Sequence, residues 1–204
     1  MNKKFYIFLT ALVLLIAGIF VSSLFVEDNT NEYNLSEILQ SPGKEHLFGT
    51  DNMGRDFLIR LLLGSRNTIL LALIVSIINI IIGFSVGLFS GYIGGIADTI
   101  FMRLVEGLLS LPSILIAVCL LGVFGGGALN LILFLTLTGW CSLARLVRNE
   151  TIIIKEQEFI IANKVFGYST FRNLFYHIMP NVFFTLVFYF IAMFIGEIYS
   201  IVSI

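Results

Sequence analysis

Charged residues are scarce in this chain. Lys, Arg, Asp and Glu make up 12% of its 204 residues, against about a quarter in soluble domains, while 58% are hydrophobic. This composition excludes an ordinary soluble domain and indicates a membrane protein. The formal net charge of −1 provides no basic excess for a nucleic acid, and we expect no nucleic-acid partner.

Cysteine and histidine are also rare, with two of each. Cys119 and Cys141 both lie within apolar runs, where a cysteine behaves as a small buried hydrophobe, so no disulfide framework is expected. His46 and His177 are far apart in the chain, and no cluster of metal-binding side chains accompanies them. We therefore expect no metal site.

Two catalytic motifs are missing. The phosphate-binding pattern G-x-x-x-x-G-K-[ST] does not occur, so the chain has no nucleotide cradle of its own, and the hydrolase pattern G-x-S-x-G is absent too. We expect a protein that is not an enzyme and holds no cofactor.

Long apolar runs dominate what is present. A bilayer-spanning helix needs about 20 such residues, and the runs predict an all-α, polytopic membrane protein with about five transmembrane helices. The chain divides into a first span (1–26), a polar extracytoplasmic segment (27–67) and a transmembrane domain (68–204). The later spans are expected at 68–93, 100–124, 128–147 and 181–204.

The polar segment contains one amphipathic stretch. We expect an interfacial helix from about Met53 to Leu63, capped by Thr50 or Asp51, that lies along the membrane before the second span.

Small and polar residues within the apolar runs are candidates for packing or function. Gly83, Gly87 and Gly91 recur every four residues and predict a face against which another helix packs closely. Pro112 must break the third span, which is tolerated only against protein or a water-lined path. Glu197 is an acid inside the fifth span; it either faces a pathway or is solvated near the outer interface.

The stretch 155–181 is the longest charged interruption in the second half. It predicts two short helices, Glu158–Val165 and Thr170–Met179, joined at Gly167, where a chain reversal favours positive φ. Ser169 is the expected N-cap of the second helix, and Pro180 then allows a fresh start before the last span.

Basic residues set the orientation. With the amino terminus in the cytoplasm, eight of the twelve Lys and Arg residues fall on the cytoplasmic side, as the positive-inside rule requires. The stretch 155–181 then faces the cytoplasm as a helical docking element for a soluble partner.

Three stretches resemble one known family. Residues 155–181 resemble the signature loop of binding-protein-dependent ABC importer permeases, with Ile161-Ala162-Asn163 in the place of E-A-A, followed by Gly167 and the ending HIMPN. HLFGTDNMGRDFLIRLLLGSR (46–66) and GYIGGIADTIFMRLVEGLLSLPS (91–113) resemble segments of the second permease of dipeptide, oligopeptide and nickel importers.

The resemblance implies a permease in the bacterial inner membrane that imports peptides or related solutes by alternating access. Its implied partners are a homologous second permease, two cytoplasmic ATPases that bind ATP, and an extracytoplasmic binding protein. The signature loop would be a coupling helix that docks in a groove of the ATPase. The residues expected to dock are Glu158, Phe159, Ala162, Val165, Phe166 and Gly167.

Family members continue through a further span, so the resemblance also implies that this chain is a truncated form. One alternative is therefore a remnant that does not transport. Another is a self-contained channel or secondary transporter, which would be expected to show inverted repeats or paired intramembrane charges; neither is evident in the sequence.

Overall fold

The computed structural model describes residues 16–26 and 34–203, and these residues form helices joined by loops. No strand occurs among them; the one β-type pairing is an isolated bridge between Thr50 and Asp56. The predicted all-α class is confirmed. Within the described residues, three helical stretches are long and apolar enough to cross a membrane: Phe57–Ile93, Ala128–Lys155 and Thr170–Val202. Residues 16–24 of the predicted first span are helical, and its remainder up to residue 15 lies outside the described part.

The chain forms two compact units, Met1–Leu70 and Leu71–Ile204. In the first, the short 3-10 helix η1 (Leu35–Glu37) precedes a loop that leads into helix α2 (Phe57–Ile93). The expected interfacial helix from Met53 is wrong as a separate element, because α2 starts at Phe57 and continues without a break through the predicted second span. Its start is capped by the Asp56 carboxylate, which accepts from the N–H of Leu58 at 2.8 Å and of Ile59 at 3.1 Å.

Thr50 and Asp51 do not cap α2. The Asp51 carboxylate instead holds the turn before it, accepting from the backbone N–H of Met53 and Arg55 and from the side chains of Arg55 and Arg60. Burial alone would raise the pKa of Asp51, but these donors hold it well below its ordinary value.

His46 of this loop lies between the carboxylates of Glu37, at the end of η1, and Asp56, directly before α2. Its Nδ1 is 2.9 Å from Asp56 and its Nε2 3.4 Å from Glu37. The hydrogen bond to Asp56, together with both negative charges, raises the pKa of His46 above its ordinary value. Burial alone would raise the pKa of Asp56. The hydrogen bonds from His46 and from the backbone N–H groups of Ile59 and Leu58 lower it below its ordinary value.

We expect this loop to be most rigid in a mildly acidic window. Asp51 and Asp56 have pKa values below the ordinary 3.8, so their stabilisation is complete above that pH and is lost as the pH falls. His46 has a pKa above the ordinary 6.5, so its stabilisation is complete below that pH and is lost as the pH rises through the folded value. Amide exchange of residues 49–57, corrected for intrinsic rates, should be slowest between about pH 4 and 6.5.

The variant His46→Gln serves as the control for this window. It should abolish the loss of protection at high pH and keep the loss at low pH. Equal protection of the native loop from pH 4 to 9 would contradict the role of His46.

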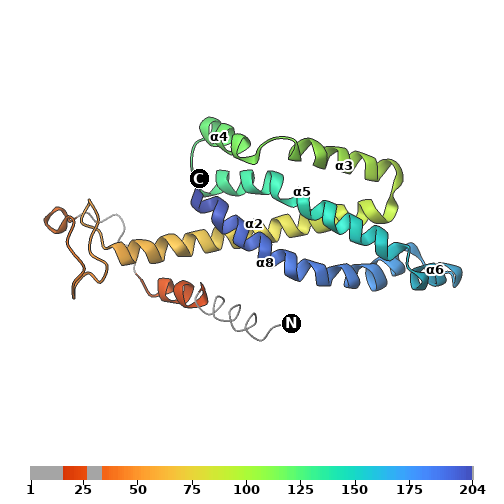
Figure 1. The fold of residues 1–204 in the computed structure, drawn as a ribbon, viewed down its shortest axis with the longest axis horizontal. Helices are drawn as coiled ribbons and strands as arrows, with labels where there is room; N and C mark the ends of the chain where they lie inside the picture. The colour runs from red at the N-terminus through yellow and green to blue at the C-terminus, as the bar shows by residue number, and fades with distance from the viewer. Residues whose placement is uncertain (1–15, 27–33, 204) are drawn as a thin grey trace. The chain divides into compact units, whose positions relative to one another are not determined.

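In the second unit, the third predicted span is broken as expected. Helix α3 (Gly95–Leu109) ends before Pro112, and helix α4 (Ser113–Phe124) starts directly after it, because proline cannot continue the hydrogen-bond ladder. The second and third predicted spans leave a connection at 94–99, but α3 already starts at Gly95, so α2 and α3 are separated by Gly94 alone. Figure 1 shows α3 and α4 side by side with the long helix α5 (Ala128–Lys155), which extends past the predicted end at residue 147.

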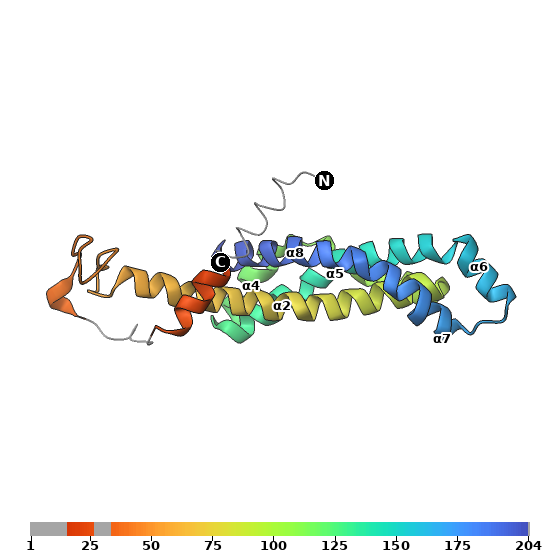
Figure 2. The ribbon, with the colours of Figure 1, turned by 90° about the horizontal axis from the view of Figure 1, so that it is seen from below.

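The segment after α5 agrees closely with its predicted local structure. Helix α6 (Glu158–Val165) has the expected bounds, Gly167 has a φ of 77°, and the Ser169 hydroxyl accepts from the N–H of Arg172 at 3.3 Å. In Figures 1 and 2, α6 lies beyond one end of the bundled helices of this unit.

The second predicted helix does not stop at Pro180. Helix α7 (Thr170–Arg172) passes into a π-helical turn, η2 (Asn173–Ile178), and then into α8 (Met179–Ser203) without a break. The π turn changes the hydrogen-bond register directly before the proline, and the Asn181 side chain donates to the carbonyl of His177 at 2.6 Å. The helix therefore continues through Pro180, although proline has no N–H to donate.

Candidate functional site

The connector between α5 and α8, residues 156–178, presents an apolar surface to solvent. Val165 is 81% and Phe166 78% exposed, and Phe159, Ala162 and Glu158 are exposed as well. Large exposed apolar side chains gathered on a short helix are typical of an interaction surface. All five of these residues and Gly167 were among the sequence candidates for docking.

A buried residue of α6 that the sequence reading did not single out anchors this surface. Ile160 is fully buried and belongs to one apolar cluster with Leu174 and Ile178 of η2 and Leu143 and Val147 of α5. No local pattern marked it, because Asn163 and Lys164, the residues one turn further along α6, are polar. Since α6 is packed onto two other helical elements, a force on α6 would be passed to α5 and α8.

The connector is also held by ring contacts. The guanidinium carbon of Arg172 lies 4.2 Å from the centroid of the Tyr168 ring, and the rings of Tyr168 and His177 stack with centroids 6.2 Å apart. These contacts cover the chain reversal after Gly167.

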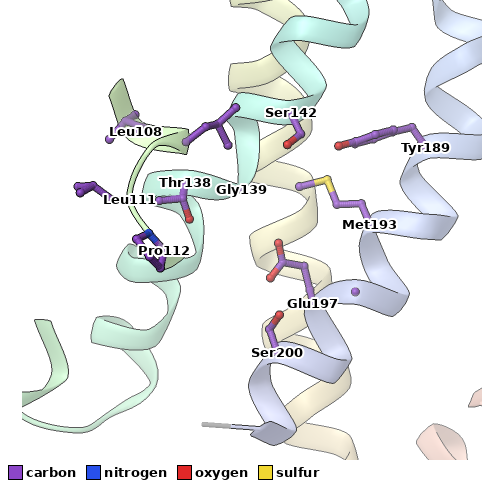
Figure 3. A pocket seen from close by; sticks show the side chains of 12 residues that line it. Leu108, Leu111, Pro112, Thr138, Gly139, Ser142, Tyr189, Met193, Glu197 and Ser200 are labelled. Atoms are coloured by element: carbon purple, nitrogen blue, oxygen red, sulfur yellow. The ribbon is translucent and has the colours of Figure 1, made fainter. Parts of the chain in front are cut away.

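A pocket of about 520 Å³ lies between three parts of the second unit. The α3–α4 break contributes Leu108, Leu109, Leu111 and Pro112; α5 contributes Thr138, Gly139 and Ser142; and α8 contributes Tyr189, Met193, Gly196, Glu197 and Ser200. The two candidates for a translocation path, Pro112 and Glu197, thus line one pocket although they are distant in sequence. Figure 3 shows the Glu197 carboxylate extending from α8 toward the α5 side of this space.

Glu197 is 8% exposed and lines this pocket. Its Oε1 accepts a hydrogen bond of 3.2 Å from Nδ2 of Asn79 on α2. Sequence reasoning missed Asn79, although an amide in an apolar run was a visible signal.

Gly139 on α5 makes this hydrogen bond possible. A Cβ atom built at Gly139 would collide with the Asn79 amide, coming within 2.9 Å of its Cγ, so the absence of a side chain leaves room for Asn79 to reach Glu197. Three helices therefore contribute to the environment of one buried acid.

The glycine face of α2 lies directly on α5. Cβ atoms built at Gly83, Gly87 and Gly91 would lie 2.7, 2.5 and 2.7 Å from the carbonyl oxygens of Trp140, Ala144 and Arg148. The backbones of the two helices are thus as close as small residues permit.

An ion pair joins α3 to α5 near the α2–α3 junction. Arg148 donates through Nε at 2.5 Å and Nη2 at 2.6 Å to the two oxygens of Asp98, and Ser90 of α2 also donates to Asp98. The Arg148 guanidinium lowers the pKa of Asp98 below its ordinary value, against the effect of burial and with help from Ser90. Close by, Lys155 donates to the carbonyl of Tyr92 at 2.6 Å.

Among the described residues, no set of three His, Cys, Asp or Glu side chains could hold a metal ion. Cys119 and Cys141 are both free thiols; Cys141 is buried as expected, whereas Cys119 is exposed.

Comparison with known proteins identifies the class. The family model described as binding-protein-dependent transport system inner membrane component matches residues 80–204, which include the pocket helices and the whole connector. The chain belongs to this family of membrane transport components.

Within this family, the relatives of the chain are permeases of ABC transport systems. The chain is 35% identical over 180 residues to the oligopeptide transport system permease protein OppC of Bacillus subtilis (strain 168), covering 88% of this chain and 59% of that protein. It is 36% identical over 177 residues to the dipeptide transport system permease protein DppC of the same strain, covering 86% and 54%.

A third relative comes from another genus. The chain is 30% identical over 173 residues to the glutathione transport system permease protein GsiD of Pectobacterium atrosepticum, covering 85% of this chain and 58% of that protein. The chain spans somewhat more than half the length of these three relatives.

Proposed function

We propose that this chain is a transmembrane permease subunit of an ATP-driven importer of peptides or related small solutes. The related solutes in this proposal are nickel or metal chelates. The single observation that carries the proposal is the connector: an exposed apolar α6 whose Ile160 is packed into the helical bundle. The names of the relatives, which include permeases for oligopeptides, dipeptides and glutathione, support the substrate class.

The proposed complex contains a second permease, two ATPases and an extracytoplasmic binding protein. Many apolar side chains of α8 are exposed, among them Phe183, Phe184 and Phe188, and such a face suits the lipid bilayer or the second permease. In this proposal the amino terminus and the connector lie in the cytoplasm, an orientation that the distribution of basic residues favours. ATP binds and is hydrolysed in the partner subunits.

Transport follows alternating access in this proposal. Closure of the ATPases moves the segment Glu158–Met179, and the force reaches α5 and α8 through Ile160, Leu174 and Ile178. The helices then reorient around a path that includes Pro112 and Glu197. No residue of this chain performs bond chemistry.

The test is capture of the cognate ATPases by tagged, co-expressed permease. Gly167→Val should reduce the captured ATPase at least about tenfold, because a β-branched residue resists the φ of 77° that the connector requires. A Cβ at Gly167 meets no atom within 4 Å, so the change acts through the backbone and not through packing.

Gly167→Asn is the matched control, since asparagine tolerates positive φ, and it should retain capture. Undiminished capture by Gly167→Val would refute the docking role. Uptake of a labelled peptide by the complete complex in vesicles tests transport itself, and a complex that binds its ATPases but imports nothing would favour the remnant.

A further inference from the structure

We propose that the pocket between the α3–α4 break, α5 and α8 binds a primary ammonium group of the transported solute, with Glu197 as its counter-ion. The amino terminus of a peptide is the group of this kind that fits the proposed function, on which the inference rests.

Glu197 is more than nine-tenths buried, and among the described residues no basic side chain pairs with its carboxylate. Its hydrogen-bond partner, Nδ2 of Asn79, is neutral. A buried carboxylate without a partner of opposite charge is costly, and a cation from outside the chain removes that cost.

The lining of the pocket carries one carboxylate and no Lys, Arg or His. An anionic group of a solute would meet no positive charge in this pocket, whereas an ammonium group would meet the Glu197 carboxylate. The site therefore selects the amino end of a peptide over its carboxyl end.

Other lining residues supply hydroxyl oxygens. A primary ammonium has three N–H donors; the hydroxyls of Thr138 and Ser142 lie on α5, and that of Ser200 lies on α8, the helix that carries Glu197. Figure 3 shows Thr138 and Ser142 on α5 facing the side of α8 that carries Glu197. Leu108, Leu111 and Met193 add apolar wall, against which a peptide side chain can pack.

Asn79 is a positioning residue in this arrangement. It donates to Oε1 through the gap left by Gly139 and fixes the carboxylate, while its own Oδ1 is buried without a partner among the described residues. Most buried amide oxygens in folded proteins have a hydrogen-bond partner, so this oxygen can accept from a donor that enters the cluster.

The experiment measures binding to the complete permease–ATPase complex in nanodiscs, with no binding protein present. The probe is radiolabelled trialanine amide, which carries one ammonium and no carboxylate, and the comparison probe is N-acetyl-trialanine amide, which is neutral. The native complex should bind the charged probe about tenfold or more tightly than the neutral one, as a charge-assisted hydrogen bond warrants.

Glu197→Gln should abolish this difference and Glu197→Asp should retain part of it. Glu106→Gln, which removes an exposed acid on α3, should leave the difference unchanged. Equal binding of both probes by the native complex, no binding of either, or an unchanged preference in Glu197→Gln would overturn the inference.

A separate readout distinguishes this inference from the proposed function. With the binding protein restored, the native complex should import trialanine at the expense of ATP. Normal import without probe preference would refute only the ammonium site, whereas no import by the native complex would refute the permease function.

Discussion

Replacing Gly87 with leucine is expected to prevent the second unit from folding stably. A Cβ at this position would lie 2.5 Å from the carbonyl oxygen of Ala144 and 2.8 Å from Cβ of Val147, both on α5. Backbone cannot rotate aside as a side chain can, so α2 and α5 must separate along their whole contact, at a cost of about 3 kcal/mol or more. The measurement is the apparent melting temperature of the purified chain in detergent, with the recovery of unaggregated protein.

Gly107→Leu is the matched control for this prediction. Gly107 also lies within a helix, α3, but a Cβ there meets no atom within 4 Å. The control should melt close to the native protein. Equal melting temperatures for Gly87→Leu and the native protein would show that α2 and α5 are not in contact at this position.

Breaking the pair between Asp98 and Arg148 is expected to have the second large effect. Both side chains are mostly buried, and the two oxygens of Asp98 accept from two nitrogens of one guanidinium. Removing one partner leaves a charge with no compensation, so Asp98→Asn should destabilise the second unit by about 2 kcal/mol. A double-mutant cycle with Arg148→Met should give a coupling energy of similar size.

Arg103 and Glu106 provide the comparison. Their side chains are 80% and 55% exposed and 3.1 Å apart, so water screens the pair and the same cycle there should give less than about 0.5 kcal/mol. Equal coupling energies for the two pairs would mean that burial adds nothing to the Asp98–Arg148 contact.

The sequence by itself determined the features that depend on neighbouring residues. The bounds of α6, the positive φ of Gly167, the cap at Ser169 and the break at Pro112 all follow from backbone sterics and from hydrogen bonds that span a few residues. The all-α membrane class followed from composition and run length, since a bilayer requires helices that satisfy their own backbone. The orientation inferred from the charge distribution stays a prediction.

Other features were decided by the tertiary structure. Asn79 and Glu197 are 118 residues apart, and Asp98 and Arg148 are 50 apart. Whether such residues meet depends on the rotation and axial offset of packed helices, which the glycine contacts between α2 and α5 fix and which no local pattern encodes. The helix also continues through Pro180, where the sequence predicted a new start, because the π turn before the proline adjusts the hydrogen-bond register. The sequence thus identified an acid within an apolar run, and only the packing of the helices placed that acid in the wall of a pocket.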